Sequence, residues 1–593
     1  MTAVKKMVFL TTAEAICVFA IYAGVLPSKT VFVLLGGLIL VMAILSLDEA
    51  VIFFVLSIPL FTALPLSIDF DNFAAWRIIV LWLFSVWIFR QRKTVSALNL
   101  SRIKSLLLQI NVFEWCIMSL FSVSSFSLLV AEDIGFGLRK LIFLANFIPL
   151  YILVRWLSAQ SGPRNKILLS ISLAGCIAVF GGILQFIVIQ FISLHTFWKH
   201  WAQWVIPVFY GSGLGGVLSA SNTWFSYYSN APPTLRLFSF FPDSHSFGLF
   251  SLIATLPTLI IFKISAGLAR KIMLTLWIIL SLSIYLSGTR GLWLAALPIF
   301  FGVLLIYLLT NHFLNIKRRL AVTFLISFVV TVSLEALVLN NIAMIVAFGA
   351  CTKMPLLCSN LLNSAFELPY NLWVIVLGLT SALLITLITY WLTIKKHVME
   401  YSLARIILLP LLAFLLLLPV SSILLSRAHG AGVVTKDETL IFNRAKSILD
   451  INETSNKARL DIWQITAKSV LAHPIFGVGL GNYAKVLGEK FEASRRGASA
   501  HNLYLDFAAE TGLVGGGLLI AFFCTIIFYS YRLLRYAKEE RLKITGAIFG
   551  IYFLWIMFYN FFDVVLINDK VLLLFSSLLG AFSGIFIEKR SRI

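Results

Sequence analysis

Residues 168–193 read LLSISLAGCIAVFGGILQFIVIQFIS and contain no charged side chain. A stretch of about 20 apolar residues is long enough to cross the hydrocarbon core of a bilayer as an α-helix, so this segment predicts a transmembrane span. The whole chain shares its character, because 60% of the 593 residues are hydrophobic, 12% are charged, and the mean hydropathy is +0.96. Soluble domains average about 25% charged residues. The composition therefore excludes a soluble globular protein and a disordered chain, and it indicates a polytopic membrane protein.

Mostly apolar runs of about 17 to 25 residues recur along the chain. The first run follows Lys5 and Lys6, and because no small-residue cleavage site ends it, we expect an uncleaved helix rather than a signal peptide. Together the runs predict an all-α fold, a polytopic integral membrane bundle of about sixteen helices, at 8–26, 31–47, 50–68, 75–91, 113–131, 138–157, 168–193, 246–262, 272–287, 291–310, 320–338, 371–394, 406–426, 513–530, 544–562 and 571–587.

The positive charge of the chain is distributed as an orientation signal. The formal net charge is +21, from 47 Lys+Arg and 26 Asp+Glu. If the N-terminus is cytoplasmic, the connections that fall on the same side carry the basic clusters at 90–93, 317–319, 395–396, 532–543 and 589–592. Cytoplasmic loops are enriched in Lys and Arg, and such clusters attract anionic lipids. The distribution predicts that both termini are cytoplasmic, and it disfavours nucleic acid as a partner.

The predicted spans divide the chain into four parts. These are N-terminal transmembrane helices (1–130), a central transmembrane region (131–426) with an aromatic external loop (194–245), a large external helical loop (427–510) and C-terminal transmembrane helices (511–593). The large loop contains 11 Lys+Arg and 9 Asp+Glu, so it resembles a small soluble subdomain more than a basic tail. Because loops held by a rigid scaffold carry many binding and catalytic residues, we expect the function there.

The large external loop contains one amphipathic helix followed by a glycine-rich segment. Apolar residues recur at helical spacing after a candidate N-cap at Asn456, and Pro474 lies just beyond the helix; they are Leu460, Trp463, Ala467, Val470 and Leu471. The glycines at 477, 479 and 481 do not predict a dinucleotide fold, because no strand or βαβ unit surrounds them. They are expected to let the backbone turn sharply between two surface helices.

Several motifs occur together in this order: SGTRG (287–291), the Arg459 and Trp463 helix, HPIFGVGLGNY (473–483) and HNLYLDFAAETGLVG (501–515). This combination resembles the O-antigen ligase and O-antigen polymerase (Wzy_C-type) superfamily of membrane glycosyltransferases. The resemblance implies a GT-C-like helical fold in the cell inner (cytoplasmic) membrane, with the active site on the external face. It also implies transfer of a glycan from undecaprenyl diphosphate to a lipid A core sugar or a second lipid-linked glycan, without a cofactor.

Three arginines are candidates for holding the diphosphate of such a donor. Guanidinium groups aimed at a diphosphate stabilise the charge that grows on it as the glycosidic bond breaks. Arg290 of the SGTRG motif is the first candidate and a catalytic one, Arg236 in TLRLFSFFPDSHSFG is the second, and Arg459 is the third. The alternatives are that Arg290 and Arg236 anchor the chain to lipid phosphates, and that Arg459 pairs with Asp461 or another carboxylate.

His501 is the candidate catalytic base, because histidine titrates near neutral pH and the family motif contains it. A lone histidine is more often a hydrogen-bonded structural residue, and that alternative stays open. Asn502 is expected to open a short helix that Gly512 ends, and Glu510 to orient or cap. Gly477 and Gly479 are supporting residues, whereas His473 is expected to belong to the helix end.

Metal binding has little support in the sequence, which lacks paired Cys-x-x-Cys and His-x-x-x-His motifs. The one acidic pair worth weighing is Asp69 and Asp71, and the alternative is that both mark the end of a span. Cys351 and Cys358 lie in a predicted external loop, where a disulfide and two free thiols are both open.

Two further questions stay open at this stage. The aromatic residues of loop 194–245 are expected to form an interfacial belt or to stack on sugars; they are Trp198, Trp201, Trp204, Tyr210, Trp224, Tyr227 and Tyr228. A transporter or flippase is the rival function, but the charges within spans are few and no internal repeat is evident; those charges are Glu14, Arg77, Glu335 and Asp563. We therefore predict a glycosyltransferase of the ligase type, with a polymerase as the alternative and lipid-linked glycans and membrane lipids as partners.

Overall fold

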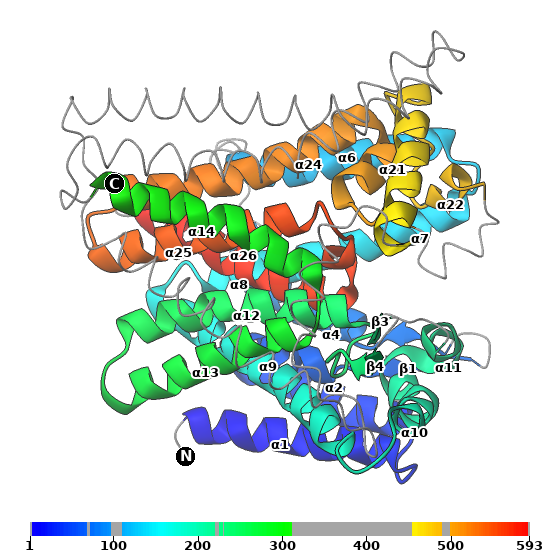
Figure 1. The fold of residues 1–593 in the computed structure, drawn as a ribbon. Helices are drawn as coiled ribbons and strands as arrows, with labels where there is room; N and C mark the ends of the chain where they lie inside the picture. Colours follow the sequence, from blue (N-terminus) through cyan, green and yellow to red (C-terminus); the bar gives the residue numbers. More distant parts are fainter. Residues whose placement is uncertain are drawn as a thin grey trace, which may run out of the picture.

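The computed structural model describes residues 3–67, 71–95, 110–219, 224–228, 231–310, 454–488 and 499–590. Most of these residues are helical, and the long helices form a bundle (Figure 1). Within the described ranges, eight segments are long and apolar enough to cross a membrane: Ser28–Leu45, Ile134–Leu157, Ser161–Val188, Ser244–Ile264, Gly267–Leu286, Leu503–Tyr536, Glu540–Tyr559 and Asp569–Ile587. The predicted all-α polytopic membrane fold is confirmed. The count of sixteen stays a prediction, because the spans at 320–338, 371–394 and 406–426 lie outside the described residues, as do Asp69, Glu335, Cys351 and Cys358.

In chain order, the main helices of the bundle are α1 (Ala3–Tyr22), α2 (Ser28–Leu45), α3 (Leu47–Ser57), α4 (Trp76–Val95), α6 (Val112–Ser127), α7 (Ile134–Ala145), α8 (Phe147–Leu157), α9 (Ser161–Val188), α12 (Ser244–Ile264), α13 (Gly267–Leu286), α14 (Arg290–Thr310), α24 (Leu503–Tyr536), α25 (Glu540–Tyr559) and α26 (Asp569–Arg590). Helices α12 and α26 are the most deeply buried spans and form the centre of the bundle. An apolar helix that is buried on all sides packs against other helices instead of lipid.

The predicted span at 50–68 is wrong in its second half. Helix α3 ends at Ser57, a 3-10 turn follows at Ile58–Leu60, and Ala63–Leu64 (β1) then pairs antiparallel with Phe73–Ala74 (β2). Pro59 lies in this turn. Proline has no N–H for a helical hydrogen bond and its ring clashes with the preceding turn, so an apolar run that contains one need not stay helical.

The predicted external loop 194–245 is folded. It contains α10 (Leu194–His200), a π-helical turn (Trp201–Val205), α11 (Ile206–Ser219) and a hairpin of β3 (Phe225–Tyr228) and β4 (Ala231–Leu235). The rings of Trp198 and Trp224 stack with centroids 3.8 Å apart, and both side chains are buried. These two tryptophans therefore pack the folded loop and are not displayed for a sugar, whereas Trp204 is 59% exposed.

Asp71 caps the second part of α11. Its Oδ2 accepts a hydrogen bond from the backbone N–H of Ser212, 2.6 Å away, just after Gly211 breaks the helix at φ +78°. Burial raises the pKa of Asp71, but the hydrogen bonds from Ser212 and Gly213 outweigh it and hold that pKa below its usual value. Among the described residues, no group of three His, Cys, Asp or Glu side chains is placed to hold a metal.

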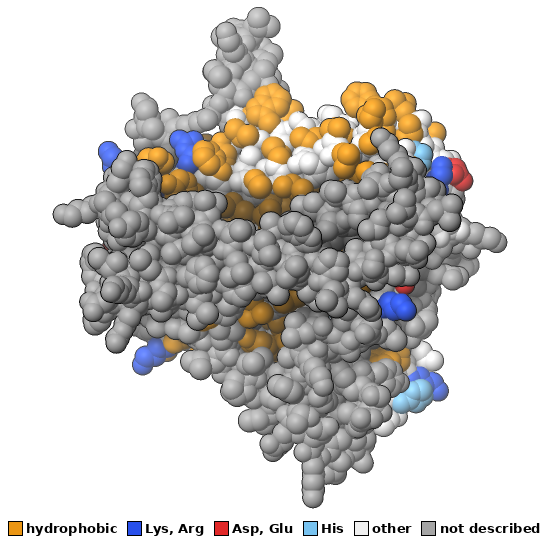
Figure 2. All heavy atoms as spheres, turned by 45° about the horizontal axis from the view of Figure 1, so that its top comes forward, with side chains coloured by type: hydrophobic (Ala, Val, Ile, Leu, Met, Phe, Trp, Pro, Cys, Tyr) orange, Lys and Arg blue, Asp and Glu red, His pale blue; other side chains and the backbone are white. Residues whose placement is uncertain are grey.

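One end of the bundle carries the irregular elements. Helices α21 (Thr454–Ala472), α22 (Tyr483–Val486), α10 and α11 and the β3–β4 hairpin lie there, opposite the two chain termini (Figure 1). In Figure 2, hydrophobic side chains make up most of the described surface in the upper part of the view, and the visible Lys, Arg, Asp, Glu and His side chains lie toward its left and right edges. A largely apolar outer surface is expected of a bundle that spans a membrane.

Candidate active site

Helix α21 forms a small second core with the segments that follow it. Helix α21 begins at Thr454, so Asn456 lies within its first turn and the predicted N-cap at Asn456 is wrong. The helix ends at Ala472, before Pro474, as expected. The predicted apolar stripe is confirmed in part, because three of its members are buried and two are half-buried. The second core contains Trp463, Val470, Val478, Tyr483, Leu505 and Ala508.

The glycine-rich segment packs its backbone directly against the start of α24. Gly477, Gly479 and Gly481 have φ values of +65°, +94° and +76°, a region that favours glycine. The backbone N–H groups of Val478 and Gly479 donate to the carbonyl oxygens of Ala509 and Glu510, at 2.8 and 3.1 Å. The segment therefore turns sharply, as expected, and satisfies carbonyls at the end of the first part of α24.

Gly512 explains why those carbonyl oxygens accept from outside the helix. It lies inside α24 with φ +77° and ψ +177°, which interrupts the helix after its first turns. The carbonyls before such a break have no helical donor and need another partner. The expected helix end at Gly512 is therefore observed, with the long membrane-spanning part of α24 following it.

The backbone before His501 is held from two sides. The N–H of Ala500 donates to Oδ1 of Asp506 at 2.9 Å, and the indole N–H of Trp463 donates to the carbonyl oxygen of Ala500 at 2.7 Å. His501 has φ +49°, an uncommon conformation for a residue other than glycine. On its other side Asn502 is the N-cap of α24, as expected, and accepts from the N–H groups of the next turn. This framework sets the position of the His501 side chain.

The His501 imidazole is half-buried and its Nδ1 has no hydrogen-bond partner among the described residues. Burial lowers its pKa; the charge of Asp563 opposes this, while Arg459 and His245 lower the pKa further. Arg459 of α21 has no hydrogen bond or ion pair to any described residue, Asp461 included. The site thus contains a neutral imidazole beside an unpaired guanidinium group.

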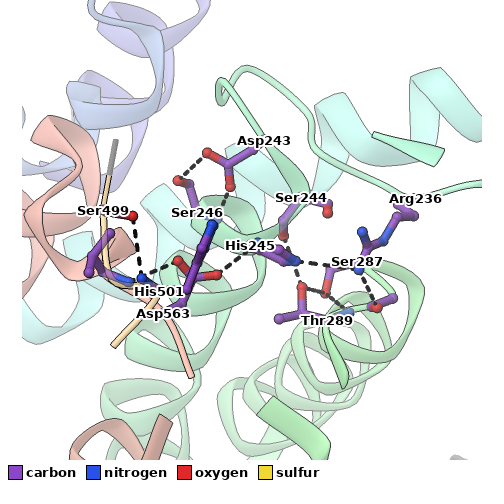
Figure 3. A network of polar contacts seen from close by, with 12 residues as sticks. Arg236, Asp243, Ser244, His245, Ser246, Ser287, Thr289, Ser499, His501 and Asp563 are labelled. Carbon is purple, nitrogen blue, oxygen red and sulfur yellow. Dashed lines mark hydrogen bonds and ion pairs between the residues drawn. The ribbon is translucent and has the colours of Figure 1, made fainter. Parts of the chain in front are cut away.

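His245 and Asp563 join the site from distant parts of the chain. Asp563 follows α25, and its Oδ2 lies 2.8 Å from Nδ1 of His245 in the first turn of α12. Figure 3 shows His245 between Asp563 and Arg236. Burial raises the pKa of Asp563, but His245, followed by His501 and Arg459, outweighs that effect and holds it below the usual value. The carboxylate is therefore ionised and surrounded by basic groups.

Arg236 connects this pair to the SGTRG turn. Its Nη2 donates to the carbonyl oxygen of Gly288 at 2.8 Å and lies 3.4 Å from Nε2 of His245. Gly288, at φ +63°, forms the turn between α13 and α14, and the hydroxyl of Thr289 bonds to the first turn of α12 (Figure 3). Arg290 begins α14 directly after this turn and is half-buried.

Glu510 does not lie in the His501 cluster. Its Oε2 is 2.6 Å from Nζ of Lys140 on α7, and Oδ2 of Asp506 is 3.9 Å from the same nitrogen. Both carboxylates are almost completely buried. This buried ion pair attaches the first part of α24 to α7, and it indirectly supports the Asp506 contact to Ala500.

The structure places Arg459 within electrostatic reach of His501 and connects Arg236 to Asp563 through His245 (Figure 3), with Arg290 at the turn that Arg236 contacts. Gly477, Gly479 and Glu510 support the segment that carries His501, and exposed His473 lies at the end of α21. The sequence did not single out His245, although it lies in the same stretch as Arg236. It gave no role to Asp563, although Asp563 is one of the few charges near a predicted span. A charged group at the edge of an apolar helix is often functional, which is the signal available for Asp563.

Residues 373–520 match the family model described as O-antigen ligase. The match includes α21, the glycine segment, His501 and the start of α24, while Arg236, His245, Arg290 and Asp563 lie outside it. A search of curated proteins finds no match to the chain. The description names a ligase, and the helices long enough to cross a membrane indicate an integral membrane protein. Residues 373–520 are therefore similar to the O-antigen ligase family, and this region carries the likeness of the chain to it.

Proposed function

We propose that the protein is an O-antigen ligase-like glycosyltransferase that moves a glycan from undecaprenyl diphosphate to a lipid A core or similar acceptor, without a metal. The observation that carries the proposal is the convergence of His501, with an unpartnered Nδ1, and the guanidinium groups of Arg236 and Arg459. A neutral base beside cationic groups is what transfer from a diphosphate leaving group requires. The family match supplies the reaction class.

The arginines hold the donor. Undecaprenyl diphosphate gains negative charge as the bond between its oxygen and the anomeric carbon breaks. Guanidinium groups form charge-assisted, often bidentate hydrogen bonds to phosphate oxygens. Arg236 and Arg459 come from separate elements and both lie within electrostatic reach of Tyr559 at the end of α25, and Arg290 begins the helix after the turn that Arg236 contacts. Interactions that strengthen with the developing charge lower the barrier.

His501 accepts the proton of the acceptor. Its lowered pKa keeps the imidazole neutral and able to take a proton from a sugar hydroxyl. The acceptor oxygen then forms the new bond to the anomeric carbon, and the electron pair of the broken bond leaves with undecaprenyl diphosphate. The contact between His245 and Asp563 fixes the orientation of the neighbouring side chains. In this scheme His245 and Asp563 are positioning residues.

The proposed orientation places the site on the external face of the cytoplasmic membrane. The end of the bundle that carries α21 and the β3–β4 hairpin lies opposite both termini (Figure 1). The basic clusters near the termini support a cytoplasmic location for them. A lipid-linked donor then reaches Arg236 and His501 from the external leaflet.

The experiment is transfer in reconstituted membranes from an undecaprenyl diphosphate glycan, with chelator, to either lipid A core or a second lipid-linked glycan. Wild type is compared with His501→Gln, Arg236→Gln and the control Arg270→Gln, at the opposite α12–α13 turn over the Phe262 ring. Product on the core, lost in the first two variants and kept in the control, supports a ligase. Lengthening of the lipid-linked glycan identifies a polymerase instead. Absence of transfer to both acceptors by folded protein refutes the enzyme proposal and favours a transporter.

A further inference from the structure

Tyr559 is the last residue of α25 and packs against the SGTRG turn. A Cβ built on Gly291 would lie 3.3 Å from Cε2 of Tyr559 and 2.8 Å from Cβ of Phe562. The side chain of Tyr559 is 1% exposed. Gly291 therefore allows the turn that begins α14 to lie directly on this ring, which places the phenol between the turn and the loop of Asp563.

The hydroxyl of Tyr559 is buried and has no hydrogen-bond partner among the described residues. It nevertheless lies within electrostatic reach of four charged groups of the site, which are Asp563, Asp243, Arg459 and Arg236. Buried side-chain polar atoms nearly always have a partner, and exceptions cluster at functional sites. An unpartnered donor at the centre of the proposed active site points to a ligand atom.

The two carboxylates near Tyr559 already accept hydrogen bonds on both oxygens. Oδ1 of Asp563 accepts from the N–H of Val564 at 2.8 Å and its Oδ2 contacts His245 at 2.8 Å. Asp243 accepts from the N–H of Ser246 at 2.7 Å and from its hydroxyl at 2.9 Å. Neither carboxylate accepts from the phenol, so its open partner is an oxygen that a ligand brings, within electrostatic reach of the two guanidinium groups.

We propose that the Tyr559 hydroxyl donates a hydrogen bond to a phosphate oxygen of the lipid-linked diphosphate, beside Arg236 and Arg459. This inference rests on the proposed function and adds one residue to its donor site. An anionic oxygen suits the position, because guanidinium groups favour it and a phenol is a good donor to it. A sugar hydroxyl of the acceptor would not use the two arginines.

The test compares Tyr559→Phe with Tyr552→Phe, which removes a hydroxyl from the same helix. The Tyr552 oxygen accepts from the indole of Trp277 at 3.2 Å and lies away from the site. Initial rates give KM for donor and acceptor separately. Inhibition by undecaprenyl diphosphate and by inorganic pyrophosphate distinguishes recognition of the lipid-linked product from recognition of any diphosphate. Binding of undecaprenyl diphosphate is also measured directly, from the rise in melting temperature of the protein in detergent.

Tyr559→Phe is expected to lower kcat/KM for the donor by about 10- to 100-fold, the effect of one hydrogen bond to a charged oxygen. The acceptor KM and the fold stay unchanged, and inhibition by the product weakens to a similar degree. Tyr552→Phe keeps wild-type kinetics. Equal behaviour of the two variants, or a change confined to the acceptor KM, overturns the proposal.

The direct binding measurement separates the two proposals. If wild type binds undecaprenyl diphosphate and Tyr559→Phe binds it more weakly, the Tyr559 assignment stands even where no acceptor is glycosylated. In that case only the proposed transfer reaction fails. If wild type does not bind undecaprenyl diphosphate, the Tyr559 assignment is wrong.

Discussion

Replacing Gly479 by alanine tests the packing that supports His501. Gly479 has φ +94°, and a Cβ there would lie 2.5 Å from the Cα of Ala131. Forcing alanine into the left-handed region costs about 1–2 kcal/mol. Pressing a methyl group onto an opposing backbone adds about 1–3 kcal/mol. The expected loss of local stability is therefore about 2–5 kcal/mol.

Two other glycines separate these contributions. Gly488 has φ +65° with nothing within 4 Å of its Cβ position, so Gly488→Ala carries only the conformational cost of about 1–2 kcal/mol. Gly517 lies in the helical part of α24 with nothing within 4 Å, so Gly517→Ala stabilises by about 0.5–1 kcal/mol. The expected order of stability is Gly517→Ala, Gly488→Ala, then Gly479→Ala.

Hydrogen exchange followed by mass spectrometry in detergent measures the effect locally. The N–H groups of Val478 and Gly479 bond to Ala509 and Glu510, so their exchange reports opening of this contact. A loss of 2–5 kcal/mol corresponds to exchange that is about thirtyfold to several thousandfold faster. If residues 477–482 are protected equally in Gly479→Ala and Gly488→Ala, the close approach to Ala131 carries no energy and the reasoning is refuted.

Further outcomes are expected for the catalytic base, its pH dependence, Arg459, the buried ion pair and metal removal. His501→Gln is expected to lower the transfer rate by about 100- to 10,000-fold, as loss of a general base does, with unchanged helical content by circular dichroism; a variant with near-normal rates excludes His501 as the base. Burial lowers the pKa of His501; the charge of Asp563 opposes this effect, and Arg459 lowers the pKa further. The imidazole therefore stays neutral at pH values below the ordinary imidazole pKa of about 6.5. Activity is expected to fall only as the pH drops through the lowered pKa. Arg459→Gln removes a positive charge that disfavours the imidazolium, so the acid limb of the kcat/KM profile moves to higher pH, and an unmoved limb contradicts the assignment. Lys140→Met leaves buried Glu510 and Asp506 without their cation and is expected to destabilise the protein by about 3–5 kcal/mol, measured by thermal unfolding against Lys140→Arg. EDTA is expected to leave the transfer rate unchanged, and a loss that Mg²⁺ restores contradicts the metal-independent mechanism.

The membrane class and several local features were readable from the sequence because each depends on neighbouring residues. Lipid imposes an internally hydrogen-bonded backbone, so a long apolar run predicts a helix without knowledge of its partners. The cap at Asn502 and the break at Gly512 are likewise local, since a side chain or a φ value sets them. The local signals failed at 50–68, where an apolar run predicts a continuous helix but Pro59 lies in the turn that follows its early end.

Tertiary structure alone decided which residues form the site. His245 is far in sequence from Tyr559 and Asp563, and their contacts arise only when α12, the end of α25 and the SGTRG turn pack together. The ion pair of Lys140 with Glu510 likewise joins α7 to α24. The sequence by itself determined that this chain is an all-α membrane protein with the motifs of the O-antigen ligase superfamily. The composition of the candidate site depended on tertiary structure, because the burial of a side chain and the charges near it come from segments that are distant in the sequence.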